Sequence, residues 1–339
     1  GGLLIKMARP ERRQETLPRK LAKKTGQEPI QKSGGNAKRR LEGTAVLDRT
    51  RNDNIRELAE DKLFALQNPM KLDGRVSSYP ASARGYSVTN CYLLRQPDAA
   101  WLIDTGFGGD EPRLRGQIES LIDRKLPLSL LPLRLNEFMS IQNIDPFTLY
   151  FNVKECFTGN PDAAFWFDFG AGSDSGKNTL DSLNITTIAR EETIPIGELG
   201  RPVVVYQAPI RLIATRWIYD EATKTMFTSD MWTHSWRDKP EGPWIIEDGD
   251  DDPTDFDKVR SFMLNTRYWW LEGVDTGKLR KGIDKILSKH DIETLAPGYG
   301  CILRGKKTVE KHIKLLDDVL KSLDKSVATS RYVSRDEER

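Results

Sequence analysis

The feature that most constrains the fold of this sequence is the segment 86–108, YSVTNCYLLRQPDAAWLIDTGFG. Its first half alternates apolar and polar residues, a turn follows at Gln96 to Asp98, and a second apolar run ends at Asp104 before a glycine-rich loop. Alternation with a period of two is typical of a strand with one buried face. Two such runs around a short turn predict a β-hairpin that leads into a loop.

Later segments repeat these two kinds of pattern. Helical spacing occurs in 114–126, 274–290 and 308–323, and strand-like runs occur in 128–140, 201–230 and 292–297. Segment 54–69 also places apolar residues at helical spacing before Pro69, so we expect a short amphipathic helix there. A hairpin followed by helices between strands predicts an α/β fold in which helices cover sheets.

Composition divides the chain into four parts. Residues 1–53 are rich in Lys, Arg, Gln, Gly and Pro, which predicts a basic flexible arm because such a segment buries too little apolar surface to order alone. Residues 54–76 are expected to form the short helix and a linker. Residues 77–325 carry the strand and helix patterns of one globular domain, and residues 326–339 predict a flexible tail.

Charge, cysteine spacing and hydropathy restrict the partners. The formal net charge is only +2 over 339 residues, and the basic residues of the arm alternate with acids, so the pattern does not favour nucleic acid. Three separated cysteines without CxxC spacing favour reduced thiols in a cytoplasmic protein. No run reaches the roughly 20 apolar residues of a membrane helix, so we expect no membrane segment.

Four segments share the order of an Asp-Thr-Gly strand end, a loop, a strand ending in Thr-Ser-Asp and an Ala-Pro-Gly-x-Gly turn. They are NCYLL…AAWLIDTGFGG, LPLRLNEFMSIQNI, YDEATKTMFTSDMW and IETLAPGYGCILRGK. Together they resemble the metallo-β-lactamase fold, in particular its oxygen-binding di-iron branch related to flavodiiron proteins. The resemblance covers residues 85–323 and implies an α/β fold, an αββα sandwich preceded by the extended N-terminal arm.

The resemblance also implies where metal ligands would stand. In the family the loop reads His-x-His-x-Asp-His, with Glu for the second His in the di-iron branch, and a further His, a bridging Asp and a final His complete two sites. Those positions here hold Leu135, Glu137, Met139, Ser140, either Arg211 or Leu212, Asp230 and Tyr299. Two carboxylates supply at most a weak site for a hard cation. We therefore expect no iron or zinc on this chain, with Glu137 and Asp230 as residual ligand positions.

Other residues near these landmarks are candidates for function. His234 follows Asp230 closely and joins Glu137 and Asp230 as a candidate catalytic residue, whereas His312 is expected at a surface or partner-facing position of the last helix. In the family the Asp104 position braces the loops. The expected lining of an emptied ligand pocket is Tyr299, Arg211, Ser140 and Trp232, and Arg211 or the Tyr299 hydroxyl is the expected donor to the two carboxylates.

Two further stretches have a distinctive composition. Aromatic residues gather between Trp217 and Trp270, and Trp and Tyr are favoured at interfaces, so we expect this stretch to form the centre of a contact with a partner. The aspartates of 247–257 alternate as in a calcium loop but lack its glycine and glutamate, which favours a solvated acidic loop.

These patterns predict a pseudoenzyme, a metallo-β-lactamase-fold subunit that has lost most metal ligands and serves as a structural or regulatory partner. The partner is expected to be a homologous chain that carries iron or zinc and a hydrolase-type or di-iron activity, or else a second copy of this chain. Two alternatives stay open. One is a hydrolase with a rearranged mono-metal or metal-free site, and the other is a small-molecule sensor that uses the emptied pocket.

Overall fold

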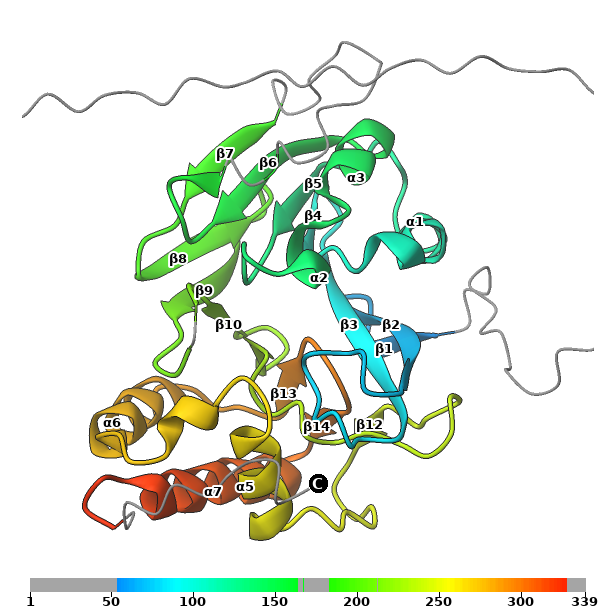
Figure 1. The fold of residues 1–339 in the computed structure, drawn as a ribbon. Coiled ribbons are helices and arrows are strands. Elements are labelled where there is room, and N and C mark those ends of the chain that lie inside the picture. The colour runs from blue at the N-terminus through cyan, green and yellow to red at the C-terminus, as the bar shows by residue number, and fades with distance from the viewer. Residues whose placement is uncertain (1–53, 164–166, 168–182, 212, 328–339) are drawn as a thin grey trace, which may run out of the picture. The chain divides into compact units, whose positions relative to one another are not determined.

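The computed structural model describes residues 54–163, 167, 183–211 and 213–327, which fold into two seven-stranded sheets with helices against them (Figure 1). The strand orders are β1-β2-β3-β4-β5-β6-β7 and β12-β14-β13-β11-β10-β9-β8. The expected arm, 1–53, lies outside the described residues, and the expected tail, 326–339, is described only as far as Val327.

The first sheet contains the predicted hairpin. Its strands are β1 (Ile55–Ala59), β2 (Leu63–Leu72), β3 (Gly85–Arg95), β4 (Ala100–Ile103), β5 (Leu128–Leu131), β6 (Val153–Thr158) and β7 (Asn184–Thr187). Strands β1 to β4 pair antiparallel and β4 to β7 pair parallel. The β3–β4 turn closes with a hydrogen bond from the Gln96 amide to the Ala99 carbonyl, which confirms the hairpin that the alternation predicts.

The second sheet contains the three runs expected in 201–230. Its strands are β8 (Glu191–Ile196), β9 (Arg201–Gln207), β10 (Arg216–Asp220), β11 (Thr225–Ser229), β12 (Ile245–Ile246), β13 (Thr294–Pro297) and β14 (Ile302–Arg304). Strands β8 to β11 pair antiparallel in sequence, and β11 pairs parallel with β13. The carboxyl ends of β11 and β13 therefore meet at one edge.

Three groups of buried side chains pack between the layers of sheets and helices. One group lies between the sheets, where Tyr92 and Phe227 meet at a centroid distance of 5.0 Å. A second packs the outer face of the first sheet against α1 (Glu111–Glu119) and α3 (Ile144–Tyr150). The third packs the second sheet against α5 (Phe256–Leu264), α6 (Thr276–Leu287) and α7 (Lys306–Leu323). This order of layers confirms the αββα sandwich.

Short helical turns complete the connections between these layers. They are η1 (Gly108–Asp110), α2 (Phe138–Ile141) and η4 (Trp269–Leu271). Over the described parts of the chain, no helix combines the length and the apolar character needed to cross a bilayer.

The helix expected over 54–69 is wrong, because this segment forms β1 and most of β2. Leu63 and Ala65 pack between the sheets, whereas Phe64 and Leu66 pack toward α1 and α3. A strand buried on both faces has a continuous apolar run instead of an alternating one, and periodicity alone does not separate it from a buried helix. Residues 54–76 thus belong to the sandwich and are not a helix with a linker.

Candidate functional site

Loops from both sheets meet at the carboxyl ends of β4, β5, β11 and β13. Asp104 follows β4, the loop with Arg134 and Glu137 follows β5, Asp230 follows β11, and Tyr299 follows β13. The Arg134 guanidinium lies 3.0 Å from Asp230 and so joins the loops of the two sheets. These strand ends are where the sequence places the candidate site.

Glu137 lies at the centre of a buried network. The Arg267 guanidinium donates to both carboxylate oxygens of Glu137, over 2.6 Å to each, and the Tyr299 hydroxyl donates to Oε1 over 2.5 Å. Arg134 also pairs with Glu137 Oε2. The side chains of Glu137 and Asp230 are 9% and 5% exposed. We call Arg134, Glu137, Asp230, Arg267 and Tyr299 the strand-end cluster, which contains two carboxylates and two guanidinium groups.

The surroundings keep Glu137 ionised and Tyr299 protonated. Burial raises the pKa of Glu137, but hydrogen bonding and charge from Arg267 and Arg134 outweigh burial, so the pKa is lowered overall. Burial, together with the Glu137 charge, raises the pKa of Tyr299 well above its ordinary value. The Tyr299 hydroxyl therefore donates a hydrogen bond to a carboxylate and does not act as a base.

Asp104 braces the loop, as the resemblance implies. Its Oδ1 accepts a hydrogen bond from the Leu133 amide over 2.8 Å, and its backbone has a φ of 59°. Burial raises the pKa of Asp104 to about 7 despite that bond. The carboxyl thus holds the start of the Glu137 loop without contacting Glu137 through a hydrogen bond.

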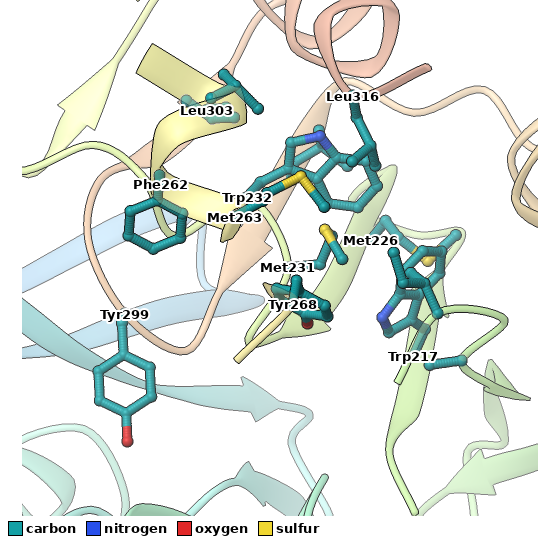
Figure 2. Close-up of a cluster of buried hydrophobic side chains, with 14 of the residues drawn as sticks. Trp217, Met226, Met231, Trp232, Phe262, Met263, Tyr268, Tyr299, Leu303 and Leu316 are labelled. Atoms are coloured by element: carbon teal, nitrogen blue, oxygen red, sulfur yellow. The ribbon is translucent and has the colours of Figure 1, made fainter. Parts of the chain in front are cut away.

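The remaining expected ligand positions face the interior. Leu135 packs among the side chains under α1 and α3, and Met139 packs on the helical side of the second sheet. A Cβ atom on Gly298 would lie 2.7 Å from the Met139 methyl group and 3.2 Å from the Ser229 carbonyl oxygen, so the turn before Tyr299 is closely packed. The Ser140 carbonyl accepts a hydrogen bond from Thr105. Tyr299 is buried, and its hydroxyl points away from Trp232 and Met231 (Figure 2).

His234 is expected beside the carboxylates as a candidate catalytic residue, and it lines a small cavity together with Asp230. Its Nε2 lies 3.0 Å from Nδ1 of His312, and Nε2 of His312 lies 2.9 Å from Oδ2 of Asp252. Burial lowers the pKa of His234 well below its ordinary value, with the neighbouring His312 adding to the effect. His234 thus belongs to a buried polar chain with His312 and Asp252.

The side chains of His312 and Asp252 are more buried than expected. His312 is fully buried, so the expected surface or partner-facing position is wrong. It falls in line with Val309, Leu316 and Val319 on the apolar face of α7, which is a signal present in the sequence. Asp252 accepts hydrogen bonds from Lys311 and Thr254 and pairs with His312, so its side chain is buried in a loop whose other acidic residues are exposed.

The arginines that bind the carboxylates were not expected from the sequence. Arg211 donates to the Ala208 carbonyl instead of Glu137, and the donors are Arg134 and Arg267. Arg134 stands in the candidate loop itself, three residues before Glu137. Arg267 is separated from Glu137 by 130 positions, and no local pattern connects them. Leu212 lies outside the described residues.

Most of the aromatic stretch belongs to the core. Its buried members include Trp217, Trp232, Trp244 and Tyr268. The Trp232 ring lies 5.5 Å from that of Trp217, and its Nε1 donates to the His312 carbonyl (Figure 2). The expectation that this stretch forms the centre of a partner contact is therefore wrong for these four residues. Trp269, which is 51% exposed, is the exception.

Little open space reaches the cluster from the helical side. The cavity beside Asp230 has a volume of about 10 Å³ and is lined by His234, Phe262 and Tyr268, among others. A space of this size holds at most one water molecule. Within 54–163, 167, 183–211 and 213–327, no group of three or more His, Cys, Asp or Glu side chains is arranged to hold a metal ion.

Known structures share this arrangement of sheets and helices. No protein-family model and no curated protein sequence matches the chain. The structure is similar to rubredoxin:oxygen oxidoreductase from the anaerobe Desulfovibrio gigas, with a TM-score of 0.59 and 15% identity over 79% of this chain. It is also similar to a putative diflavin flavoprotein fragment from Nostoc sp. (TM-score 0.60, 13% identity over 79% of this chain) and to the flavodiiron protein from Giardia intestinalis (TM-score 0.57, 14% identity over 79% of this chain).

The extent of the match differs between these proteins. The chain spans 62% of the length of the Desulfovibrio gigas protein, 59% of the Giardia intestinalis protein and 95% of the Nostoc sp. fragment. At such low identity the likeness concerns the fold. The expected α/β sandwich is thus found again in experimental structures, and the chain has the metallo-β-lactamase-like fold of the flavodiiron proteins.

Proposed function

We propose that this chain is a non-catalytic subunit of the metallo-β-lactamase fold in which the strand-end cluster takes the place of a metal centre. The observation that carries this proposal is the pairing of Glu137 and Asp230 with Arg134 and Arg267. In this role the chain is a structural or regulatory partner of another chain.

The donor set does not fit a dinuclear iron or zinc centre. Such a centre needs several neutral imidazoles and carboxylates with free oxygens. Here both oxygens of Glu137 accept hydrogen bonds from Arg267, and the second guanidinium lies between Glu137 and Asp230. A bound cation would have to displace these groups and would be repelled by two positive charges at close range. The charges of the cluster already balance without metal.

The two alternatives receive less support from the same geometry. A rearranged hydrolase site needs a base or nucleophile with room for a substrate, but Glu137 is enclosed by three donors and His234 bonds to His312. A sensor needs a ligand-sized pocket, and the cavity beside Asp230 measures about 10 Å³. Small-molecule pockets commonly occupy about 300–1,000 Å³.

Exposed aromatic side chains next to the cluster support a partner role. Phe138 follows Glu137 directly and is 71% exposed, and Trp269 lies two residues after Arg267 and is 51% exposed. Large exposed aromatic residues are favoured at protein contacts because they bury much apolar area with few rotatable bonds. We propose that this face contacts a metal-bearing homologous chain, which would hold the iron or zinc, or a second copy of this chain.

The metal content of the purified chain tests the first half of the proposal. Plasma mass spectrometry of the protein, expressed in medium with added iron and zinc, should give well under one metal ion per chain. The flavodiiron protein from Giardia intestinalis, prepared in the same way, is the positive control for the assay. About two metal ions per chain would show that the cluster opens to bind metal and that the proposal is wrong.

The assembly test uses the exposed aromatic side chains. Co-expression with a metal-bearing homologue from the same genome should give a stable complex, or the chain alone should form a dimer, in size-exclusion chromatography with light scattering. The double variant Phe138→Ser/Trp269→Ser should weaken that assembly. Leu199→Ser, which changes a 66% exposed side chain between β8 and β9, is the matched control and should leave it intact.

A further inference from the structure

Three arginines lie near the edge where the strand-end cluster is found. Arg216 opens β10, and its amide donates to the Leu133 carbonyl, next to Arg134. Gln207 of β9 pairs with Arg216, and the Gln207 amide in turn bonds to the Arg190 carbonyl. Arg190 and Arg216 therefore stand in one row across neighbouring strands, and paired residues of one row share a face of the sheet.

The guanidinium of Arg216 is buried but only partly bonded. The residue is 5% exposed, and its Nη2 donates to the carbonyls of Gly159 and Ile188. Its Nε and Nη1 are buried and have no hydrogen-bond partner among the residues that the structure describes. A buried ionised donor without a partner is costly, so two such nitrogen atoms on one side chain indicate a missing acceptor.

The neighbouring backbone leaves room for this guanidinium. A Cβ atom on Gly159 would lie 2.7 Å from Nε and 3.0 Å from Cζ of Arg216, so the guanidinium packs closely against the Gly159 backbone. Its hydrogen bonds to Gly159 and Ile188 hold the guanidinium beside the ends of β6 and β7, which these two residues follow.

The charges of the three arginines are not balanced nearby. In the part of the chain that the structure describes, no Asp or Glu forms an ion pair with Arg190, Arg211 or Arg216. Burial lowers the pKa of Arg216, and the charges of Arg211 and Arg190 lower it further. Burial and Arg190 likewise lower the pKa of Arg211. The three positive charges repel one another, and a bound anion would offset this repulsion.

We propose that Arg190, Arg211 and Arg216 form a binding site for a phosphate-type oxyanion, held either as the free ion or as the phosphate group of a small ester. Guanidinium groups bind such oxygens through paired, charge-assisted hydrogen bonds. Nε and Nη1 of Arg216 supply two buried donors, and the partly exposed Arg211 and the exposed Arg190 add charge at the rim. The site is separate from the strand-end cluster, whose arginines are already paired.

Isothermal titration calorimetry of the full chain with inorganic phosphate, in a low-salt buffer free of other oxyanions, tests the site. We expect one phosphate per chain and a loss of about tenfold or more in affinity for Arg216→Gln, with a smaller loss for Arg190→Gln. Arg280→Gln is the matched control, because Arg280 pairs with Asp317 between α6 and α7, and its affinity should match that of the unmodified protein.

Two further measurements make the outcome decisive. Phenyl phosphate binding more tightly than inorganic phosphate identifies an ester as the ligand, and equal affinity identifies the free ion. If Arg216→Gln does not fold, as judged by circular dichroism, the double variant Arg190→Gln/Arg211→Gln replaces it and should lose most of the binding. Absence of phosphate binding to the unmodified protein, or equal binding by these variants, overturns the proposal.

Discussion

The Tyr299 hydroxyl and the Arg267 guanidinium bind the same carboxylate, yet their removal should have unequal effects. Tyr299→Phe removes one hydrogen bond to Glu137 and keeps the ring, so the free energy of unfolding should fall by about 1 kcal/mol. Arg267→Met leaves the two buried carboxylates with one guanidinium and should lower it by about 3 kcal/mol. Urea unfolding followed by fluorescence measures both values.

An exposed ion pair provides the control for this comparison. Arg75 pairs with Asp73, but 86% of its side chain is exposed, so Arg75→Met should leave the free energy of unfolding almost unchanged. If Arg267→Met has no larger effect than Arg75→Met, the strand-end cluster does not hold the loops of the two sheets together.

His234 should make stability depend on pH. The folded protein keeps His234 neutral, whereas the unfolded chain takes up a proton near pH 6.5. Because the unfolded state then binds more protons, the free energy of unfolding should fall by about 1.4 kcal/mol per pH unit as the pH drops below 6.5. The side chains that act on the pKa of His234 are those of His312, Lys258, Asp252 and Lys311.

Urea unfolding at several pH values between 5 and 7 tests this slope. His234→Gln keeps a donor for Nδ1 of His312 but does not titrate, so its free energy of unfolding should fall less steeply over this range. Parallel curves for the two proteins would mean that His234 is already protonated in the folded state.

Single residues show what the sequence could and could not predict. Glu137, Asp230 and Tyr299 were placed at strand ends correctly because short landmarks fix their positions relative to the strands. Their partners were not, because side-chain contacts such as Arg267 with Glu137 join positions 130 residues apart. His312 is a different case. Its residue type suggests an exposed position, whereas its place on the apolar face of α7 indicates a buried one.

At the scale of secondary structure, β2 should be sensitive on both faces. Leu66 is fully buried on the helical side of the first sheet, so Leu66→Ala should lower the free energy of unfolding by about 2–5 kcal/mol. Arg56→Ala, on an exposed position of β1, is the control and should have little effect. Equal effects of the two substitutions in urea unfolding would contradict the pairing of β2 between β1 and β3.

Helices with one exposed face are easier to predict from the sequence than strands with none. The structure confirms the helical patterns of α6 and α7, whereas the hairpin of β3 and β4, which is buried on both faces, is indicated by the turn between its two runs. Strand β2 pairs along its length with β3 and has core residues on both sides, so its pattern lacks the contrast between faces that periodicity requires. Its pairing depends on contacts that are distant in sequence.

At the scale of the whole molecule, stability should not depend on metal. A metal ion that binds only the folded state raises the free energy of unfolding. The increase grows with the logarithm of the free metal concentration divided by the dissociation constant. With the carboxylates already paired to arginines, the unfolding temperature in EDTA should agree with that in micromolar zinc or ferrous iron to within about 1 °C. Differential scanning fluorimetry gives the comparison, and a clear rise with either metal would contradict the proposed role of the strand-end cluster.

The whole fold was predictable because its landmarks recur in order along the chain, whereas the domain boundary was not. The expected domain began at residue 77, but the first sheet already includes Ile55. Order along the chain identifies the central strands on which the landmarks lie. It carries no information on an edge strand such as β1, which holds none of them.

The close packing of Met139 against Gly298 and the pairing of both arginines have a consequence for mutational paths. Replacing Arg134 or Arg267 alone leaves the buried carboxylates of Glu137 and Asp230 with too little positive charge beside them. Replacing Tyr299 alone with His removes the hydroxyl that donates to Glu137 and does not complete a set of metal ligands. Each first step toward a metal centre therefore lowers stability before any metal can compensate. A population of such proteins would gain metal binding only through simultaneous changes, so stepwise selection does not readily lead from this cluster to a metal centre.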